Sequence, residues 1–146
     1  MFDLVLFVAF PYVAVFLAVA VGVYRYMSDR FSYSSQSSQF LENRALFWGS
    51  VPWHYGILII LLAHLVAMLA PGVWAGLIAE PVRLYTLEII GLALALSATV
   101  GLALLIFRRL SNARIFSVTS TMDWGLLAVL LAQVVLGFVV ALFYRW

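Results

Sequence analysis

Four long apolar stretches divide the sequence, at about residues 4–24, 51–70, 85–107 and 124–143. Each is long enough to cross a bilayer, because a spanning helix needs about 20 apolar residues. Charged side chains make up 10% of the chain, whereas soluble domains contain about 25%. The sequence therefore predicts an all-α fold: a single integral membrane helical bundle over residues 1–146, with four transmembrane helices.

Prolines and polar residues predict where these helices begin, bend and end. Pro11 lies inside the first stretch and should kink or break it, because proline lacks the N–H of a helical hydrogen bond. Ser50 is a candidate N-cap for the second helix, Pro52 suits its first turn, and Pro71 should end it. Asp123 is a candidate cap for the fourth helix.

The arginines predict how the chain is oriented. Six of the eight lie in the connections at residues 25–49 and 108–122, and the chain has no lysine. Because basic residues gather on the cytoplasmic side, we expect these two connections in the cytoplasm, with the N-terminus and Trp146 outside. The net charge of +2 is too small to indicate nucleic-acid binding. The absence of cysteine excludes disulfides and iron–sulfur clusters held by this chain.

His54 and His64 are the only histidines, and both lie in the second apolar stretch. Helical geometry separates them by roughly 15 Å along the axis and by about 80° around it. They are therefore too far apart to share one metal ion, but two neutral imidazoles at different depths could each bind one haem iron. The alternative is that both simply pack or hydrogen-bond between helices.

Polar residues elsewhere give weaker indications. Haem propionates could pair with arginines at the cytoplasmic rim, although these residues could equally be positive-inside anchors: Arg108, Arg109 and Arg114. A quinol site could use residues on the same side as His64, or these could be interfacial anchors: Arg83, Tyr85 and Glu88. Polar groups inside the spans should hydrogen-bond between helices or back to helix carbonyls: Ser97, Thr99 and Gln133.

Three stretches resemble one family, the di-haem cytochrome b (gamma) subunit of respiratory nitrate reductase and its relatives. The first is the connection around residues 37–44. The second is the helix with His54, His64 and Pro71. The third runs from Arg108 through Gln133. The resemblance covers nearly the whole chain, and its most specific part is the pair of histidines with nine residues between them.

The resemblance implies an oxidoreductase subunit in a prokaryotic cytoplasmic membrane. In the family, quinol is oxidised near the outer face and electrons cross two haem b groups to an iron–sulfur subunit and a molybdenum catalytic subunit on the cytoplasmic side. His54 would ligate the haem nearer the cytoplasm, and His64 the haem nearer the outer face. No residue of this chain would be catalytic in its own right.

The chain departs from the family pattern at the second axial ligands. The family has five helices, and two histidines on the fifth complete the haem sites, whereas residues 1–146 contain four apolar stretches and two histidines. We therefore expect a truncated chain, a separate source for these ligands, or altered ligation, for which Met68 and Met122 are conceivable thioethers. Two functional alternatives remain: a haem-free membrane anchor for a peripheral complex, and a small four-helix transporter.

Overall fold

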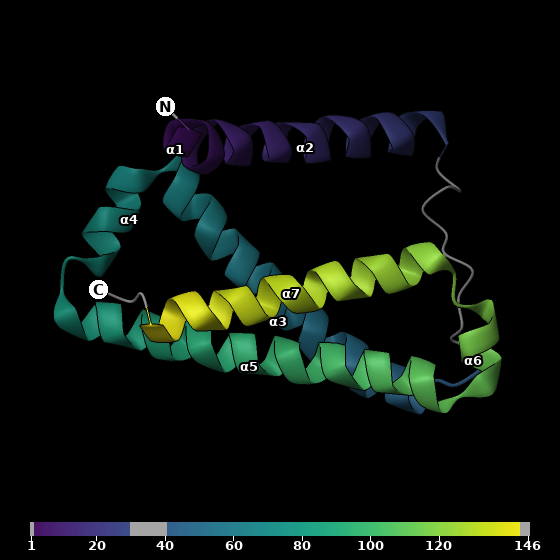
Figure 1. Cartoon of the computed structure of the whole chain (residues 1–146). Coiled ribbons are helices and arrows are strands. Elements are labelled where there is room, and N and C mark those ends of the chain that lie inside the picture. The colour runs from purple at the N-terminus through teal and green to yellow at the C-terminus, as the bar shows by residue number, and fades with distance from the viewer. Residues whose placement is uncertain (1, 30–40, 144–146) are drawn as a thin grey trace. The chain divides into compact units, whose positions relative to one another are not determined.

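The computed structural model describes residues 2–29 and 41–143, which fall into two compact units that divide after residue 37. The described residues form helices and no strands (Figure 1). Four helical segments are long and apolar enough to cross a membrane, at Phe2–Ser28, Arg44–Leu69, Pro81–Ser111 and Thr121–Phe143. The prediction of an all-α membrane bundle with four spans is therefore confirmed. The serine-rich part of the first connection, at residues 30–40, and Trp146 lie outside the described residues.

The first unit is one apolar helix with a widened turn near its start. It runs through α1 (Phe2–Leu4), the π-helical segment η1 (Val5–Ala9) and α2 (Phe10–Ser28). The backbone N–H of Phe10 donates to the Val5 carbonyl, five residues back. This wider turn directly precedes Pro11, whose ring would clash with the preceding carbonyls in a regular α-helix. The break predicted at Pro11 is thus a π-helical turn.

The second unit begins with α3 (Arg44–Leu69), which starts earlier than the apolar pattern predicted. The Glu42 carboxylate accepts hydrogen bonds from two backbone N–H groups of the first turn, at 2.7 and 3.3 Å. These bonds satisfy donors that the start of a helix leaves unpaired. The prediction of Ser50 as the N-cap is therefore wrong. Ser50 and Pro52 both lie inside α3, and Glu42 performs the capping.

The later helices follow in short succession. The second span ends at Leu69, and Pro71 opens the next helix, as expected from its fixed φ angle. The remaining helices are α4 (Pro71–Ile78), α5 (Pro81–Ser111), α6 (Ala113–Val118) and α7 (Thr121–Phe143).

The start of α7 has a reciprocal cap. Ser120 Oγ accepts from the backbone N–H of Asp123 at 3.2 Å, and the Asp123 carboxylate accepts from the backbone N–H of Ser120 at 2.9 Å. This is the arrangement of a capping box, with Asp in place of the usual Glu or Gln. Ser120 is therefore the residue before the helix, and Asp123 completes the pair from inside the first turn.

Helix α5 is the centre of the second unit, because it contacts α3, α4, α6 and α7 (Figure 1). It crosses α3 at small residues, where the two backbones touch. A Cβ atom added to Gly101 would lie 2.6 Å from the Gly49 carbonyl oxygen and 2.7 Å from the Trp53 nitrogen. On the α3 side, a Cβ added to Gly56 would lie 2.8 Å from a backbone oxygen of α5. Small residues allow such close approach between membrane helices.

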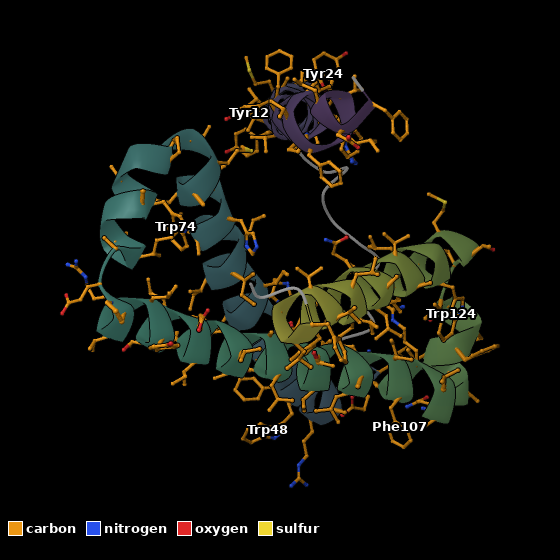
Figure 2. The ribbon with its side chains drawn as sticks, turned by 60° about the vertical axis from the view of Figure 1, so that its left-hand side comes forward. Tyr12, Tyr24, Trp48, Trp74, Phe107 and Trp124 are labelled. Carbon is orange, nitrogen blue, oxygen red and sulfur yellow. The ribbon has the colours of Figure 1, made fainter. Side chains whose placement is uncertain are left out.

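The core that holds α3, α5 and α7 together is small. Its buried side chains are Trp53, Ala98, Leu102, Leu127 and Val134. Most other apolar side chains face outward, and in Figure 2 Trp48 and Phe107 point away from the bundle. An outward apolar surface is expected where the surroundings are lipid rather than water.

Candidate functional site

The two histidines share one local geometry. His64 Nδ1 lies 2.8 Å from the Ile60 carbonyl oxygen, and His54 Nδ1 lies 2.7 Å from the Ser50 carbonyl oxygen. A carbonyl oxygen only accepts hydrogen bonds, so we assign the ring proton to Nδ1 in both residues. Nε2 then carries the lone pair, and neither Nε2 has a hydrogen-bond partner within residues 2–29 and 41–143.

In this geometry each imidazole could act as a ligand to a haem iron. A metal-bound histidine usually donates its other ring N–H to a carbonyl or carboxylate, which fixes the ring orientation and its tautomer. Within the described parts of the chain, no group of three or more His, Cys, Asp or Glu side chains could hold a bare metal ion. A porphyrin supplies four iron ligands of its own, so one imidazole at each depth is a sufficient contribution from α3.

The histidines lie at different angles from the α3–α5 contact. With the line through Gly49, Trp53 and Gly56 as reference, His64 lies roughly 50° and His54 roughly 130° around α3. Both side chains are exposed. His64 therefore borders the space on the α5 side, whereas His54 faces away from α5.

A cavity of about 710 Å³ opens where α3 and α5 diverge, bounded also by α4 and α7. Its volume is within the range of small-molecule sites, and its wall is mostly apolar. In Figure 2, Trp74 extends from α4 toward the space between α3 and α5. The polar or titratable side chains in the wall are His64, Trp74, Glu88 and Gln133.

The structure separates the three residues predicted for a quinol site. Glu88 lines the cavity together with His64, but Arg83 and Tyr85 do not. Arg83 Nε instead lies 3.3 Å from Glu80 Oε2 at the exposed start of α5. Tyr85 is about half exposed. Of the three, only Glu88 shares a cavity with a histidine.

Gln133 lines the cavity, which the sequence did not predict. We predicted that its amide would hydrogen-bond between helices or to a helix carbonyl. Thr99 does so, because its hydroxyl donates to the Ala95 carbonyl at 2.7 Å. The Gln133 side chain has no hydrogen-bond partner among the described residues, although it lies in a candidate membrane span. An amide within an apolar segment was the available signal, but its direction depends on how α7 packs.

The three predicted propionate ligands have different surroundings. Arg108 is 3% exposed at its side chain and donates from Nε to Glu42 Oε2 at 2.7 Å. Its Nη2 donates to the Glu42 carbonyl oxygen at 2.6 Å, so a propionate would have to compete with Glu42. Arg109 Nη1 donates to Thr119 Oγ1 at 3.2 Å. The Arg114 side chain is exposed and has no partner in the described part of the chain.

Glu42 is the second residue that sequence reasoning missed. The backbone N–H of Ala45 and the guanidinium of Arg108 both stabilise its charged form and lower the pKa of this carboxyl below its ordinary value. Glu42 thus remains ionised at neutral pH and acts at once as a helix cap and as an ion-pair partner.

Comparison with known proteins places these features in a family. The family model for the nitrate reductase gamma subunit matches residues 3–146. The nitrate reductase gamma chain of Bacillus subtilis (strain 168) is 33% identical over 129 residues, which are 87% of this chain and 58% of that protein. Respiratory nitrate reductase 2 gamma chain of Escherichia coli (strain K12) is 29% identical over 88% of this chain and 57% of its own length.

A longer relative matches over a similar region. Nitrate reductase-like protein NarX of Mycobacterium tuberculosis (strain ATCC 25618 / H37Rv) is 31% identical over 130 residues, which cover 87% of this chain and 20% of that protein. The chain thus spans less than two thirds of each of these relatives. Since the family model covers nearly all of the sequence, the chain belongs to the nitrate reductase gamma subunit family.

Proposed function

We propose that this chain is the membrane haem b subunit of a respiratory nitrate reductase. It would take electrons from quinol and pass them to an iron–sulfur subunit and a molybdenum catalytic subunit. The observation that carries this proposal is the shared geometry of His54 and His64. In both, Nδ1 is held by a carbonyl four residues back and Nε2 is left to ligate.

The two imidazoles would hold two haem groups at two depths of the membrane. Haem, when bound, supplies one-electron redox chemistry, and the protein supplies ligation and surroundings of low polarity. The rise of α3 separates the two ligating residues by roughly 15 Å along the axis. A second protein ligand for each haem would come from elsewhere, because His54 and His64 are the only histidines of this sequence.

The cavity next to His64 is the proposed site of quinol oxidation. Quinol loses two protons and two electrons as it becomes quinone. His64 would hold the haem that takes up the electrons, and both protons would leave on the outer side of the membrane. Glu88 lines the same cavity and is the proposed acceptor of a quinol proton. Arg83 and Tyr85 lie outside that lining and would serve as interfacial anchors.

The arginine-rich ends of the helices are proposed to face the cytoplasm, with the N-terminus outside. Arg109 and Arg114 are the better-placed candidates for contact with a propionate or a partner subunit. Arg108 would act instead through Glu42, as a link between the start of α3 and the end of α5.

Visible spectroscopy of the intact subunit, assembled with its partner subunits, tests this function. We expect a reduced-minus-oxidised b-type spectrum from two haems, and the loss of one haem in each of His54→Ala and His64→Ala. His64→Ala should also abolish quinol oxidation. Thr99→Val, which removes a hydroxyl outside the cavity, should keep both haems. Retention of both haems in the two histidine variants would refute the proposal, and a complex without any haem would favour the anchor or transporter alternatives.

A further inference from the structure

Besides His64 and Trp74, the cavity presents two polar side chains able to hydrogen-bond a small headgroup. Glu88 belongs to α5 and Gln133 to α7, and both line the wall with His64 of α3. The remaining lining residues are mostly aliphatic or glycine. A ligand in this space would therefore meet apolar contacts over most of its surface and polar contacts at a few points, which is typical of sites for small organic molecules.

The Gln133 amide lacks a hydrogen-bond partner within the described residues, and such a ligand would supply one. An amide in hydrocarbon is costly unless it is hydrogen-bonded, because it loses its bonds to water. The Thr99 hydroxyl, also within a span, donates a hydrogen bond to the carbonyl four residues back. Gln133 makes no such bond within the described residues, and its side chain lies at the cavity wall rather than in the α5–α7 contact made by Leu127 and Val134.

Two glycines line the same cavity as Gln133. Gly137 lies one turn further along α7, and Gly91 lies on the facing side of α5. A Cβ atom added to either would meet nothing within 4 Å. These glycines are therefore not needed for close helix packing, in contrast to Gly101, and their small size leaves room for a flat ring near the amide.

We propose that Gln133 is a binding residue for the quinol headgroup, holding one of its oxygens through the side-chain amide. This inference rests on the proposed function and adds the residue that positions the substrate. The amide can donate to a quinone carbonyl and accept from a quinol hydroxyl, so it can bind both redox forms. Glu88, across the same cavity, would face the second oxygen.

Substitutions in the intact subunit, assembled with its partners, test this role. Gln133→Met keeps the approximate volume but removes both hydrogen-bonding groups, and Gln133→Asn keeps the amide on a shorter side chain. The substrate probe is 2-methyl-1,4-naphthoquinol. Its oxidised form, the quinone, is the binding probe, titrated by quenching of tryptophan fluorescence. Trp74 lines the cavity, so the part of the quenching that disappears in Trp74→Phe reports occupancy of this site.

We expect Gln133→Met to raise the KM for the quinol and the Kd for the quinone about tenfold, as loss of one hydrogen bond predicts, while kcat stays within about twofold. The KM and Kd of Gln133→Asn should lie between those of Gln133→Met and the parent. Thr99→Val, which removes a satisfied hydroxyl outside the cavity, should leave KM and Kd unchanged.

Two results would overturn the inference while leaving the proposed function intact. One is that Gln133→Met binds the quinone and oxidises the quinol with parental constants. The other is that Gln133→Met lowers thermal stability and haem content but leaves the Kd of the assembled protein unchanged, which is the signature of a structural amide. A parent complex that contains no haem and does not oxidise the quinol would refute the proposed function itself, and this inference with it.

Discussion

Glu42 and Arg108 tie the start of α3 to the end of α5 through a 2.7 Å contact between Oε2 and Nε. The Arg108 side chain is almost fully buried, so its charge depends on this partner. We expect Arg108→Met to lower the midpoint of thermal unfolding by several degrees, because it leaves the Glu42 carboxylate without its cation. Arg109→Met, which removes a 3.2 Å bond to Thr119 and a 4.0 Å contact with Asp123, is the matched control and should have a smaller effect. Equal midpoints for the two variants would contradict this role for Arg108.

The pKa of Glu42 predicts an acid-sensitive end of α3. A carboxyl whose pKa is lowered by folding contributes stability that is complete above its ordinary value of 4.5 and is lost as the pH falls through the folded pKa. We therefore expect part of the loss of stability below pH 4.5 to disappear in Glu42→Gln, which is already uncharged. Thermal unfolding followed by circular dichroism between pH 7 and pH 3 measures this. Glu80→Gln, at an exposed ion pair, should keep the parental profile.

The close crossing at Gly101 predicts a large effect from one methyl group. In Gly101→Ala, the new Cβ would lie 2.6 Å from the Gly49 carbonyl oxygen, so α3 and α5 must move apart. We expect a loss of about 1–3 kcal/mol in the free energy of unfolding, as for other overpacked sites. In Gly125→Ala the Cβ meets nothing within 4 Å, and the variant should gain up to about 1 kcal/mol from lower chain entropy. Similar stability of the two variants would contradict the close backbone contact between α3 and α5 at Gly101.

Ser50 should affect the midpoint potential of the haem proposed at His54. Its hydroxyl oxygen lies 3.0 Å from His54 Nδ1, beside the carbonyl that accepts the ring proton. Loss of this second acceptor in Ser50→Ala makes the imidazole a weaker electron donor, which destabilises the oxidised iron. We expect a small positive shift in the midpoint potential of that haem alone. The haem at His64 is the internal control, and an equal shift in both haems would argue against a local effect.

Glu88 should affect the rate of quinol oxidation rather than binding. Glu88→Gln keeps a hydrogen-bonding group in the cavity but cannot accept a proton, so we expect kcat to fall about a hundredfold, with the quinone Kd nearly unchanged. This pattern is the reverse of that expected for Gln133→Met. Steady-state kinetics with the assembled complex measures it, and Glu80→Gln, outside the cavity, should behave as the parent. A parental kcat in Glu88→Gln would exclude Glu88 as the proton acceptor.

Local sequence patterns were sufficient to predict the membrane spans. The four apolar runs gave four helices because hydrophobic length alone decides whether a segment can cross a bilayer. The helix start at Arg44 was missed because its cap, Glu42, stands before the apolar run and is held by Arg108, 66 positions away. No local pattern reports a partner at that separation.

The candidate site was only partly predictable for a similar reason. Both histidines were evident from their rarity, and the local bonds to Ser50 and Ile60 arise within single helical turns. The grouping of His64 with Glu88 and Gln133 depends on how three helices cross, which the sequence does not state. Arg83 and Tyr85 seemed equivalent to Glu88 from their positions along the chain, but neither of them lines the cavity wall.

The backbone contact at Gly56 holds α3 close to α5 at this point, so a change in the tilt of α3 would pivot about it. His54 is two residues from it, whereas His64 is eight residues away, or roughly 12 Å along the axis. A slight change in the tilt of α3 would therefore displace His64 several times further than His54. A ligand that separates α3 from α5 near α4 would therefore displace the His64 imidazole and leave the His54 imidazole almost stationary.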